Sequence, residues 1–444
     1  MALNTDFLHT AGDVIIKTLA LASNRGVYEN LIDYLVEINI HENLFSPFLT
    51  GSIVLSDSRN LIRDMVIVGD EVLVAEFRTP GLPEDAVIKK VFRIYSLKDK
   101  FYAKDGNTQL YVLHFCSPET FADIDNPIFQ AFEGKPEDIV QEIFDTYLSL
   151  DKNISLDGNV LPIEKNNINI ISKSTNKIKF VSPGWSPIEC INWISSKSIP
   201  EEGGANFLFW ETVYGFFYGT INDLIKENII LGNYALSEAA ANALLVDDAN
   251  KKLATIKSLK VKQSFDQLSN RITGYLSNRL TDVDLYNKNY KNIDYDHTLD
   301  FNNYSHLEGN KSIPLFEYSS TKNPATSRAL NYSYPTLFDN VENNFDSITK
   351  EVYGNRKSNM LELGNFRMEL GIHGRTDVFC GGVINVTLPK ASPYSLSDKS
   401  TDETHDILYS GNYLITNITH KINPKYHHIS MLVSKDSLSS AGYS

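Results

Sequence analysis

Residues 411–433, GNYLITNITHKINPKYHHISMLV, contain two runs of alternating apolar and polar residues with a turn between them. Such alternation is typical of β-strands that bury one face. Residues 91–115, VFRIYSLKDKFYAKDGNTQLYVLHF, have the same arrangement, and the Asp105-Gly106 pair between the two runs is a strong turn signal. The sequence therefore predicts two similar hairpins in distant parts of the chain.

A wider match surrounds the two hairpins. Residues 63–74, RDMVIVGDEVLV, align without a gap with residues 375–386, RTDVFCGGVINV. Differences in spacing fall in predicted loops, where insertions are tolerated, and the apolar positions keep to one face. We infer an internal duplication; the alternative is that unrelated hairpins resemble one another. The aligned pairs are Gly69 with Gly381, Val72 with Ile384, Val74 with Val386, Ile53 with Phe366, Leu55 with Met368, Phe92 with Tyr413, Ile94 with Ile415, Leu97 with Ile418, Tyr111 with Ile429, Leu113 with Met431 and Phe115 with Val433.

Length, charge and cysteine content limit the class of protein. The 444 residues suffice for about two to four domains. A net charge of −14 disfavours adhesion to nucleic acid but permits a passage through which nucleic acid slides. Three well-separated cysteines without a C-x-x-C pattern indicate neither a disulfide framework nor a structural zinc site. Because we find no basic leader and no apolar run near the roughly 18 residues of a membrane span, we expect assembly in the cytoplasm without membrane insertion.

Two segments depart from the strand pattern. Residues 136–148, PEDIVQEIFDTYL, place apolar residues on one face of a helix. A second helix is expected in SPIECINWISS, where Ser186 and Glu189 have the spacing of a capping box. The aromatic segment 206–219, NFLFWETVYGFFYG, follows as a predicted hairpin, and residues 237–249 predict a short helix.

The pattern as a whole predicts a β-rich α+β chain. It consists of two similar antiparallel β-barrel domains and outer α+β insertions, because the strand spacing suits small barrels or sandwiches. The predicted divisions are 1–117 for the first barrel, 118–250 for an α+β outer domain, 251–282 for the first strands of the second barrel, 283–354 for a loop-rich outer domain, 355–436 for the remainder of the second barrel and 437–444 for a flexible tail.

Common motifs of catalysis and ligand binding are absent from the sequence. The sequence contains no G-x-S-x-G, no phosphate-binding P-loop and no G-x-G-x-x-G. Four histidines gather near the C-terminus, but adjacent histidines in a strand point to opposite faces. We therefore expect barrel-edge or surface histidines, no metal, no cofactor and no catalytic residues. The histidines are His405, His420, His427 and His428.

Residues 251–279 have a distinct charge pattern. They contain seven Lys or Arg residues and a single acid, Asp266. One interpretation is a solvated strand face. The other is a contact surface for an acidic neighbour, in which charge complementarity would set register and assembly rate. The candidate interface residues are Lys257, Lys260 and Lys262.

The order and spacing of several motifs resemble a known family. These motifs are SRNLIRDMVIVGDEV at 58–72, FLFWETVYGFFYG at 207–219, GNF at 364–366 and GNYLITNITH at 411–420. Together they resemble the central baseplate hub protein of T-even-type contractile-tailed phages and, more distantly, the hub part of type VI secretion spike proteins. The chain departs from that family's pattern by being longer, mainly around residues 281–350, in the region of the outer domains.

The resemblance implies a structural virion protein rather than an enzyme. In that family two similar barrels per chain form a tube-like ring as a homotrimer. The implied partners are a central tail spike protein, tail tube or tube-initiator ring proteins and other baseplate proteins, with transient passage of DNA and tape-measure protein. Such a protein is assembled in the host cytoplasm and ends in the tail baseplate. The alternatives are the equivalent hub of a protein-injection machine and a carbohydrate-binding protein with two β domains.

Overall fold

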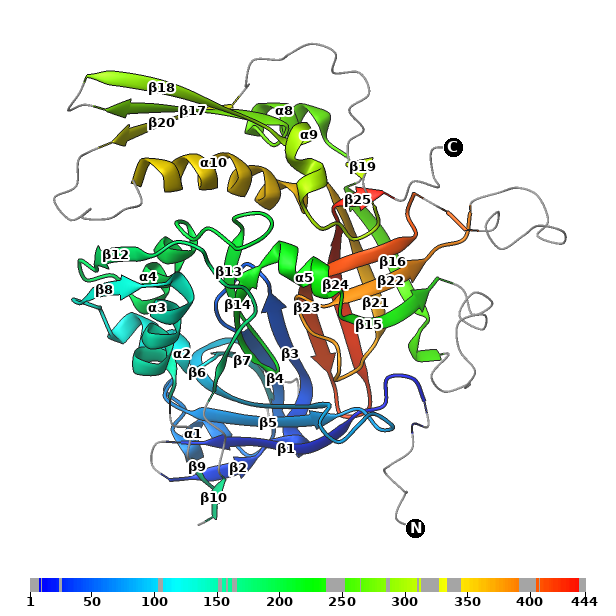
Figure 1. The fold of residues 1–444 in the computed structure, drawn as a ribbon. Coiled ribbons are helices and arrows are strands. Elements are labelled where there is room, and N and C mark those ends of the chain that lie inside the picture. The colour runs from blue at the N-terminus through cyan, green and yellow to red at the C-terminus, as the bar shows by residue number, and fades with distance from the viewer. Residues whose placement is uncertain are drawn as a thin grey trace, which may run out of the picture.

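The computed structural model describes most of the chain. The described residues are 8, 10–23, 26–102, 107–150, 154–156, 159–161, 166–236, 252–263, 265–284, 288–309, 311–312, 327–333, 345–390, 405–406 and 408–438. They form a β-rich α+β fold, as predicted, whose largest sheet has 13 strands (Figure 1). None of their helices is long and apolar enough to cross a membrane. The helix predicted at 237–249 lies outside the described residues.

The first part of the sheet, here called the first sheet unit, has the strand order β3-β4-β7-β6-β5-β1 with antiparallel pairing throughout. A short strand, β2, continues it beyond β1. The apolar face of this unit encloses Ile38, Ile53, Phe92 and Phe115, all fully buried. The strands are β1 (Ile15–Ala22), β2 (Tyr28–Asn30), β3 (Leu35–Asn43), β4 (Thr50–Asp57), β5 (Val72–Arg78), β6 (Val87–Tyr102) and β7 (Gln109–Cys116), with short helices η1 (Ile32–Tyr34) and α1 (Leu61–Met65).

The second sheet unit repeats that order as β16-β21-β24-β23-β22-β15. Five of the six strands pair antiparallel as their counterparts do, whereas β15 runs parallel to β22 although β1 is antiparallel to β5. Its core contains Met368, Ile384, Tyr413 and Met431. The strands are β15 (Ile230–Ala235), β16 (Ile256–Gln263), β21 (Phe366–His373), β22 (Val383–Thr387), β23 (Gly411–Ile422) and β24 (His427–Lys435).

Two matched β-bulges support the internal duplication independently of strand order. In the first unit the register shifts between Ile94 and Ser96 of β6, and in the second between Ile415 and Asn417 of β23. A second pair of shifts follows Leu35 in β3 and Ile256 in β16. Bulges are built-in features of a strand pair. Their recurrence at equivalent positions confirms the predicted repeat of hairpins.

The ladders correct the alignment in two strands. Leu73 lies opposite Phe92 and Ile384 opposite Tyr413, so Ile384 corresponds to Leu73 and not to Val72. Buried residues at 73, 74 and 75 in succession hide the phase of the alternation, which explains the slip of one residue. In β4, Ile53 corresponds to Leu370 rather than Phe366, since their partners are Leu113 and Met431. A shift of four residues keeps the same face, so alternation alone could not detect it.

The prediction of two barrels is not confirmed. No ladder among the described strands closes either unit, and the two units instead form one continuous sheet because β23 also pairs with β3. In this junction Asn417 lies opposite Asn43 and Ile422 opposite Ile38. Figure 1 shows the first unit, in blue, side by side with the orange and red strands of the second unit at this seam.

The first insertion spans residues 119–227 and packs against the first unit. Ser186 and Glu189 form the predicted capping box at the start of α4. The predicted aromatic hairpin is β13–β14, whose Phe207, Phe216 and Tyr218 are buried. The elements are α2 (Glu119–Asp125), β8 (Ala131–Gly134), α3 (Pro136–Ile143), η2 (Phe144–Leu148), β9 (Ile154–Leu156), β10 (Asn159–Leu161), β11 (Ile168–Ile170), β12 (Ile178–Val181), α4 (Pro187–Ser195), β13 (Phe207–Thr212), β14 (Gly215–Thr220) and α5 (Ile221–Glu227).

The second insertion, residues 267–362, is more regular than the sequence indicated. The predicted loop-rich segment contains strands of a three-stranded sheet, β18-β17-β20, and a helix of 18 residues, α10, packed beneath it (Figure 1). Strand β17, predicted to belong to the second barrel, lies in this sheet. The elements are α8 (Gln267–Thr273), β17 (Ser277–Asp284), β18 (Asn289–Asp296), α9 (His297–Asp300), η3 (Phe301–Asn303), β19 (Lys311–Ser312), β20 (Ser327–Ser333) and α10 (Phe345–Glu362).

The predicted flexible tail begins with ordered residues. Ser437 and Leu438 form the short strand β25 (Ser437–Leu438), which pairs with β19 and is buried. The remaining tail residues, 439–444, lie outside the described part of the chain. The C-terminal end of the second unit is thereby tied to the second insertion.

Candidate assembly interface and buried polar clusters

The three predicted interface lysines lie together on β16, the outermost strand of the second unit. β16 pairs with β21 along one edge, and no described strand pairs with its other edge. Two lysines have partners within the chain: Lys262 forms an ion pair with Glu369, and the ammonium group of Lys257 lies 4.2 Å from the ring centroid of Tyr426. Lys260 lies opposite Glu369 in the ladder. Their predicted role toward an acidic neighbour stays a prediction.

A second free edge lies on β6. This strand is 16 residues long, but β5 pairs only with Val87–Arg93, its first half. The second half pairs with β7 alone among the described strands. Three aromatic residues there are largely solvent-exposed: Tyr95 at 49%, Phe101 at 64% and Tyr102 at 64%. An unpaired strand edge with exposed aromatic side chains is a surface suited to pairing with another strand.

The junction between the two units is an example of such strand pairing within the chain, since β3 pairs there with β23. Glu42 of β3 is buried there, and its two carboxylate oxygens accept hydrogen bonds from Val213 N at 3.2 Å and Cys380 N at 2.8 Å. His420 Nε2 of β23 lies 3.5 Å from the same carboxylate. The junction therefore has a polar interior whose backbone donors come from both the first insertion and the second unit.

The C-terminal histidines take different positions from those predicted. His420 and His427 are fully buried and their rings contact through His420 Nδ1 and His427 Nε2 at 3.1 Å, so the prediction of edge or surface positions is wrong for both. Burial lowers the pKa of His427 well below its usual range. His428 points to the opposite face from His427, as expected for adjacent residues of a strand. His405 is half-buried and forms an isolated antiparallel β-bridge with Pro389.

A buried ion pair fastens the first insertion to the first unit. Glu211 of β13 and Lys90 of β6 are 1% and 5% exposed, and Lys90 Nζ lies 2.9 Å from Glu211 Oε1. The other carboxylate oxygen accepts hydrogen bonds from Leu49 N, at 3.0 Å, and from the Ser117 hydroxyl. A buried charge is tolerated only when it is paired and hydrogen-bonded, and here both conditions hold.

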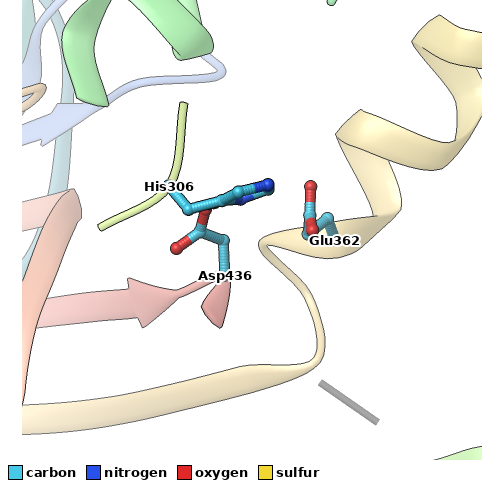
Figure 2. A group of neighbouring side chains, drawn as sticks. All are labelled: His306, Glu362 and Asp436. Carbon is cyan, nitrogen blue, oxygen red and sulfur yellow. The ribbon is translucent and has the colours of Figure 1, made fainter. Parts of the chain in front are cut away.

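A third polar cluster joins the second insertion to the end of β24. Figure 2 shows His306, Glu362 and Asp436, which come from three separate segments and point toward one another. His306 Nδ1 lies 2.8 Å from Asp436 Oδ2, and its Nε2 lies 2.7 Å from the carbonyl oxygen of Phe301. Asp436 Oδ1 also accepts from Leu307 N at 3.1 Å.

The hydrogen bonds of His306 indicate that it forms an ion pair with Asp436. The ligand atoms of the cluster's three residues lie within 4.8 Å of one another, a spacing that a metal ion could also use. However, both ring nitrogens of His306 face acceptors, which calls for two N–H groups and hence an imidazolium. Burial lowers the pKa of His306. The hydrogen bond and charge of Asp436, the charge of Glu362 and the hydrogen bond to Phe301 together outweigh burial, so the pKa is raised. The arrangement therefore holds a proton rather than presenting a free nitrogen.

Sequence reasoning identified the basic strand but missed these buried clusters. Glu42 and Glu211 occupy strand positions that would otherwise be read as solvent-facing polar residues. Their partners lie far along the chain, such as Cys380 for Glu42 and Leu49 for Glu211. His306 stands in an Asn- and Tyr-rich stretch without periodicity. No local signal in the sequence marks any of the three.

Comparisons with known proteins give a fold relationship. No protein-family model matches the sequence, and no curated protein is significantly similar to it. The structure is similar to a tail protein from Neisseria meningitidis MC58, with a TM-score of 0.53 and 10% identity over 96% of this chain and 98% of that chain. This similarity shows that the two proteins share a fold.

Two further solved structures have lower scores. The 43 kDa tail protein of prophage MuSo2 from Shewanella oneidensis has a TM-score of 0.49 and 9% identity over 95% of this chain and 100% of that one. A component of the type VI secretion system of E. coli has a TM-score of 0.42 and 8% identity over 96% of this chain and 77% of that one.

Proposed function

We propose that this protein is a structural component of a contractile tail baseplate, the homotrimeric central hub that joins a trimeric tail spike to a hexameric tail tube. The observation that carries the proposal is the tandem repeat of one sheet unit, joined through β3 and β23. The fold shared with a bacterial tail protein supports it.

The symmetry of the repeat gives the physical reason. The two units meet through different edges, β3 of the first and β23 of the second, which is a heterologous contact. Heterologous contacts between similar units close into rings when the rotation permits. Three chains with two units each then present six similar units, so one face can match three-fold partners and the other six-fold partners.

The remaining features accord with a role in assembly and passage. A net charge of −14 would disfavour adhesion of DNA to the wall of a central channel, through which DNA and tape-measure protein pass. The partners proposed are the central spike protein, tube or tube-initiator proteins and other baseplate proteins, in a virion tail assembled in the host cytoplasm. No catalytic role is proposed, since the buried polar clusters described above serve contacts within the fold.

The oligomeric mass tests this proposal. Light scattering of the purified protein, alone and with its spike protein, should give three copies of the 50.0 kDa chain, about 150 kDa, as the hub component. Assembly interfaces of this kind bury on the order of thousands of Å², so the trimer should survive dilution. A chain that remains monomeric alone and in the presence of the spike would contradict the proposal.

A further inference from the structure

The β3–β23 junction shows which strand edges of the two units pair, so the equivalent edges elsewhere in the chain can be identified. In this junction, the edge of β3 that faces away from β4 pairs with the second half of β23. The strand equivalent to β3 is β16, since each is the outer neighbour of equivalent strands, β4 and β21. The strand equivalent to β23 is β6, since both carry the matched bulge.

No described strand occupies either of those two equivalent edges. β16 ends the sheet order, and the second half of β6 extends past β5. They lie on different units of one chain, with six strands between them in the sheet, so they are not partners in that sheet. If the second unit contacts the first unit of another copy in the way that the first unit contacts the second within the chain, β16 of one copy lies beside β6 of the next.

We infer that β16 of one copy pairs antiparallel with the second half of β6, residues 96–102, in a neighbouring copy. This pairing corresponds to the β3–β23 junction, except at a register shift between Lys98 and Phe101 of β6 that β23 lacks. This inference deepens the proposed function and rests on its ring, because it names the surfaces through which the ring closes. The occupant is a second copy of this chain rather than an unrelated partner, since the same strand pairing is already present once within the chain.

The ladders fix the register between the copies. Ile422 of the internal junction lies opposite Ile38. Tyr102 is the counterpart of Ile422, because their β7 and β24 partners, Gln109 and His427, correspond. Leu259 is the counterpart of Ile38, because its partner Leu370 corresponds to Ile53. Tyr102 of one copy therefore lies opposite Leu259 of the next.

The next pair in the ladder is Phe101 opposite Lys260, equivalent to Lys421 opposite Asn39. This pairing covers the ring of Phe101, which is 64% exposed in the single chain. The aliphatic stem and ammonium group of Lys260 suit contact with an aromatic ring. Lysines on a free edge strand also discourage indiscriminate pairing, so they are compatible with an edge reserved for one partner.

A cysteine pair tests this register. Phe101→Cys combined with Lys260→Cys should give disulfide-linked dimers and trimers under mild oxidation, and reduction should return the single chain. The matched control combines Phe101→Cys with Val261→Cys, because adjacent strand residues point to opposite faces and should not cross-link. Val261 is 37% exposed, so a cysteine at this position is accessible to the oxidant. The native Cys116, Cys190 and Cys380 are buried and should not form competing disulfides.

Noncovalent mass, measured on the same samples before oxidation, separates this inference from the proposed function. A trimer in which the Phe101–Lys260 pair links at least tenfold more chains than the control supports both. A trimer with no cross-link, with equal linking in the control, or with a link confined to one chain overturns the strand pairing and leaves the hub intact. A protein that stays monomeric overturns both.

Discussion

Glu211 shows how a single buried charge positions a whole insertion. Its carboxylate joins Lys90, Leu49 and Ser117 of the first unit to strand β13 of the first insertion. Such a pair contributes little net stability compared with apolar residues of the same volume, but removal of one partner leaves an unpaired buried charge. The position is therefore far more sensitive to single than to double substitution.

This asymmetry gives a prediction for Glu211. Glu211→Ala should destabilise the contact between β13 and the first unit by about 3–5 kcal/mol, because Lys90 loses its counter-charge. Denaturant unfolding followed by tryptophan fluorescence checks it, since Trp210 is adjacent and buried. The double variant Glu211→Leu with Lys90→Met should recover most of the loss. An equal or larger loss in the double variant would contradict the account.

His306 gives a prediction about pH. Its pKa is raised by Asp436, against the opposing effect of burial. The imidazolium is therefore favoured in the folded state, and its stabilisation is fully present below the unfolded pKa of about 6.5 and is lost as pH rises through the folded pKa. Glu362, whose carboxylate lies near the ring, also faces this proton.

Hydrogen exchange can follow this change locally. Backbone amides at Leu307 and Glu308, which donate to Asp436 and Ser437, should exchange more slowly relative to their intrinsic rates at pH 6 than at pH 9. His306→Gln should abolish that difference. Local measurement is needed because His427, whose pKa is lowered by burial, has the opposite effect: the stability that it contributes is lost as pH falls through its unfolded pKa. Unchanged protection in the wild-type protein would refute the assignment of an imidazolium.

At the scale of elements, local patterns predicted hairpins and caps better than sheets. The hairpins β6–β7 and β23–β24 and the capping box of α4 were predictable because their signals lie within a few residues. The sheet β18-β17-β20 was not, because its strands are rich in Asn and Asp and lack a continuous apolar face. Tertiary packing on α10 decides their conformation instead.

The α4 cap gives an element-scale prediction. Ser186→Ala should destabilise the first insertion by about 1 kcal/mol, because the Glu189 amide loses the Ser186 hydroxyl as acceptor. Ser186→Asp should retain most of the stability, since aspartate also caps helices well. Thermal unfolding by circular dichroism compares the two variants. A Ser186→Asp protein as destabilised as Ser186→Ala would show that the cap is not the source of the effect.

The whole molecule depends on contacts that no sequence pattern reveals. The predicted duplication was correct in strand order, but no ladder among the described strands closes a barrel, because the second edge of β3 pairs with β23 rather than with another strand of its own unit. Such long-range pairing depends on which edges are left free after both units fold. The sequence carries only the alternation of each strand, so the continuous sheet could be recognised only in three dimensions.

Electron microscopy of the purified assembly tests the central claim most directly. We expect a ring of three chains with six similar sheet units and a β-strand junction at each of six seams, three within chains and three between β16 and β6. An assembly without three-fold symmetry, or a three-fold ring whose seams between chains lack paired strands at β16 and β6, would contradict it.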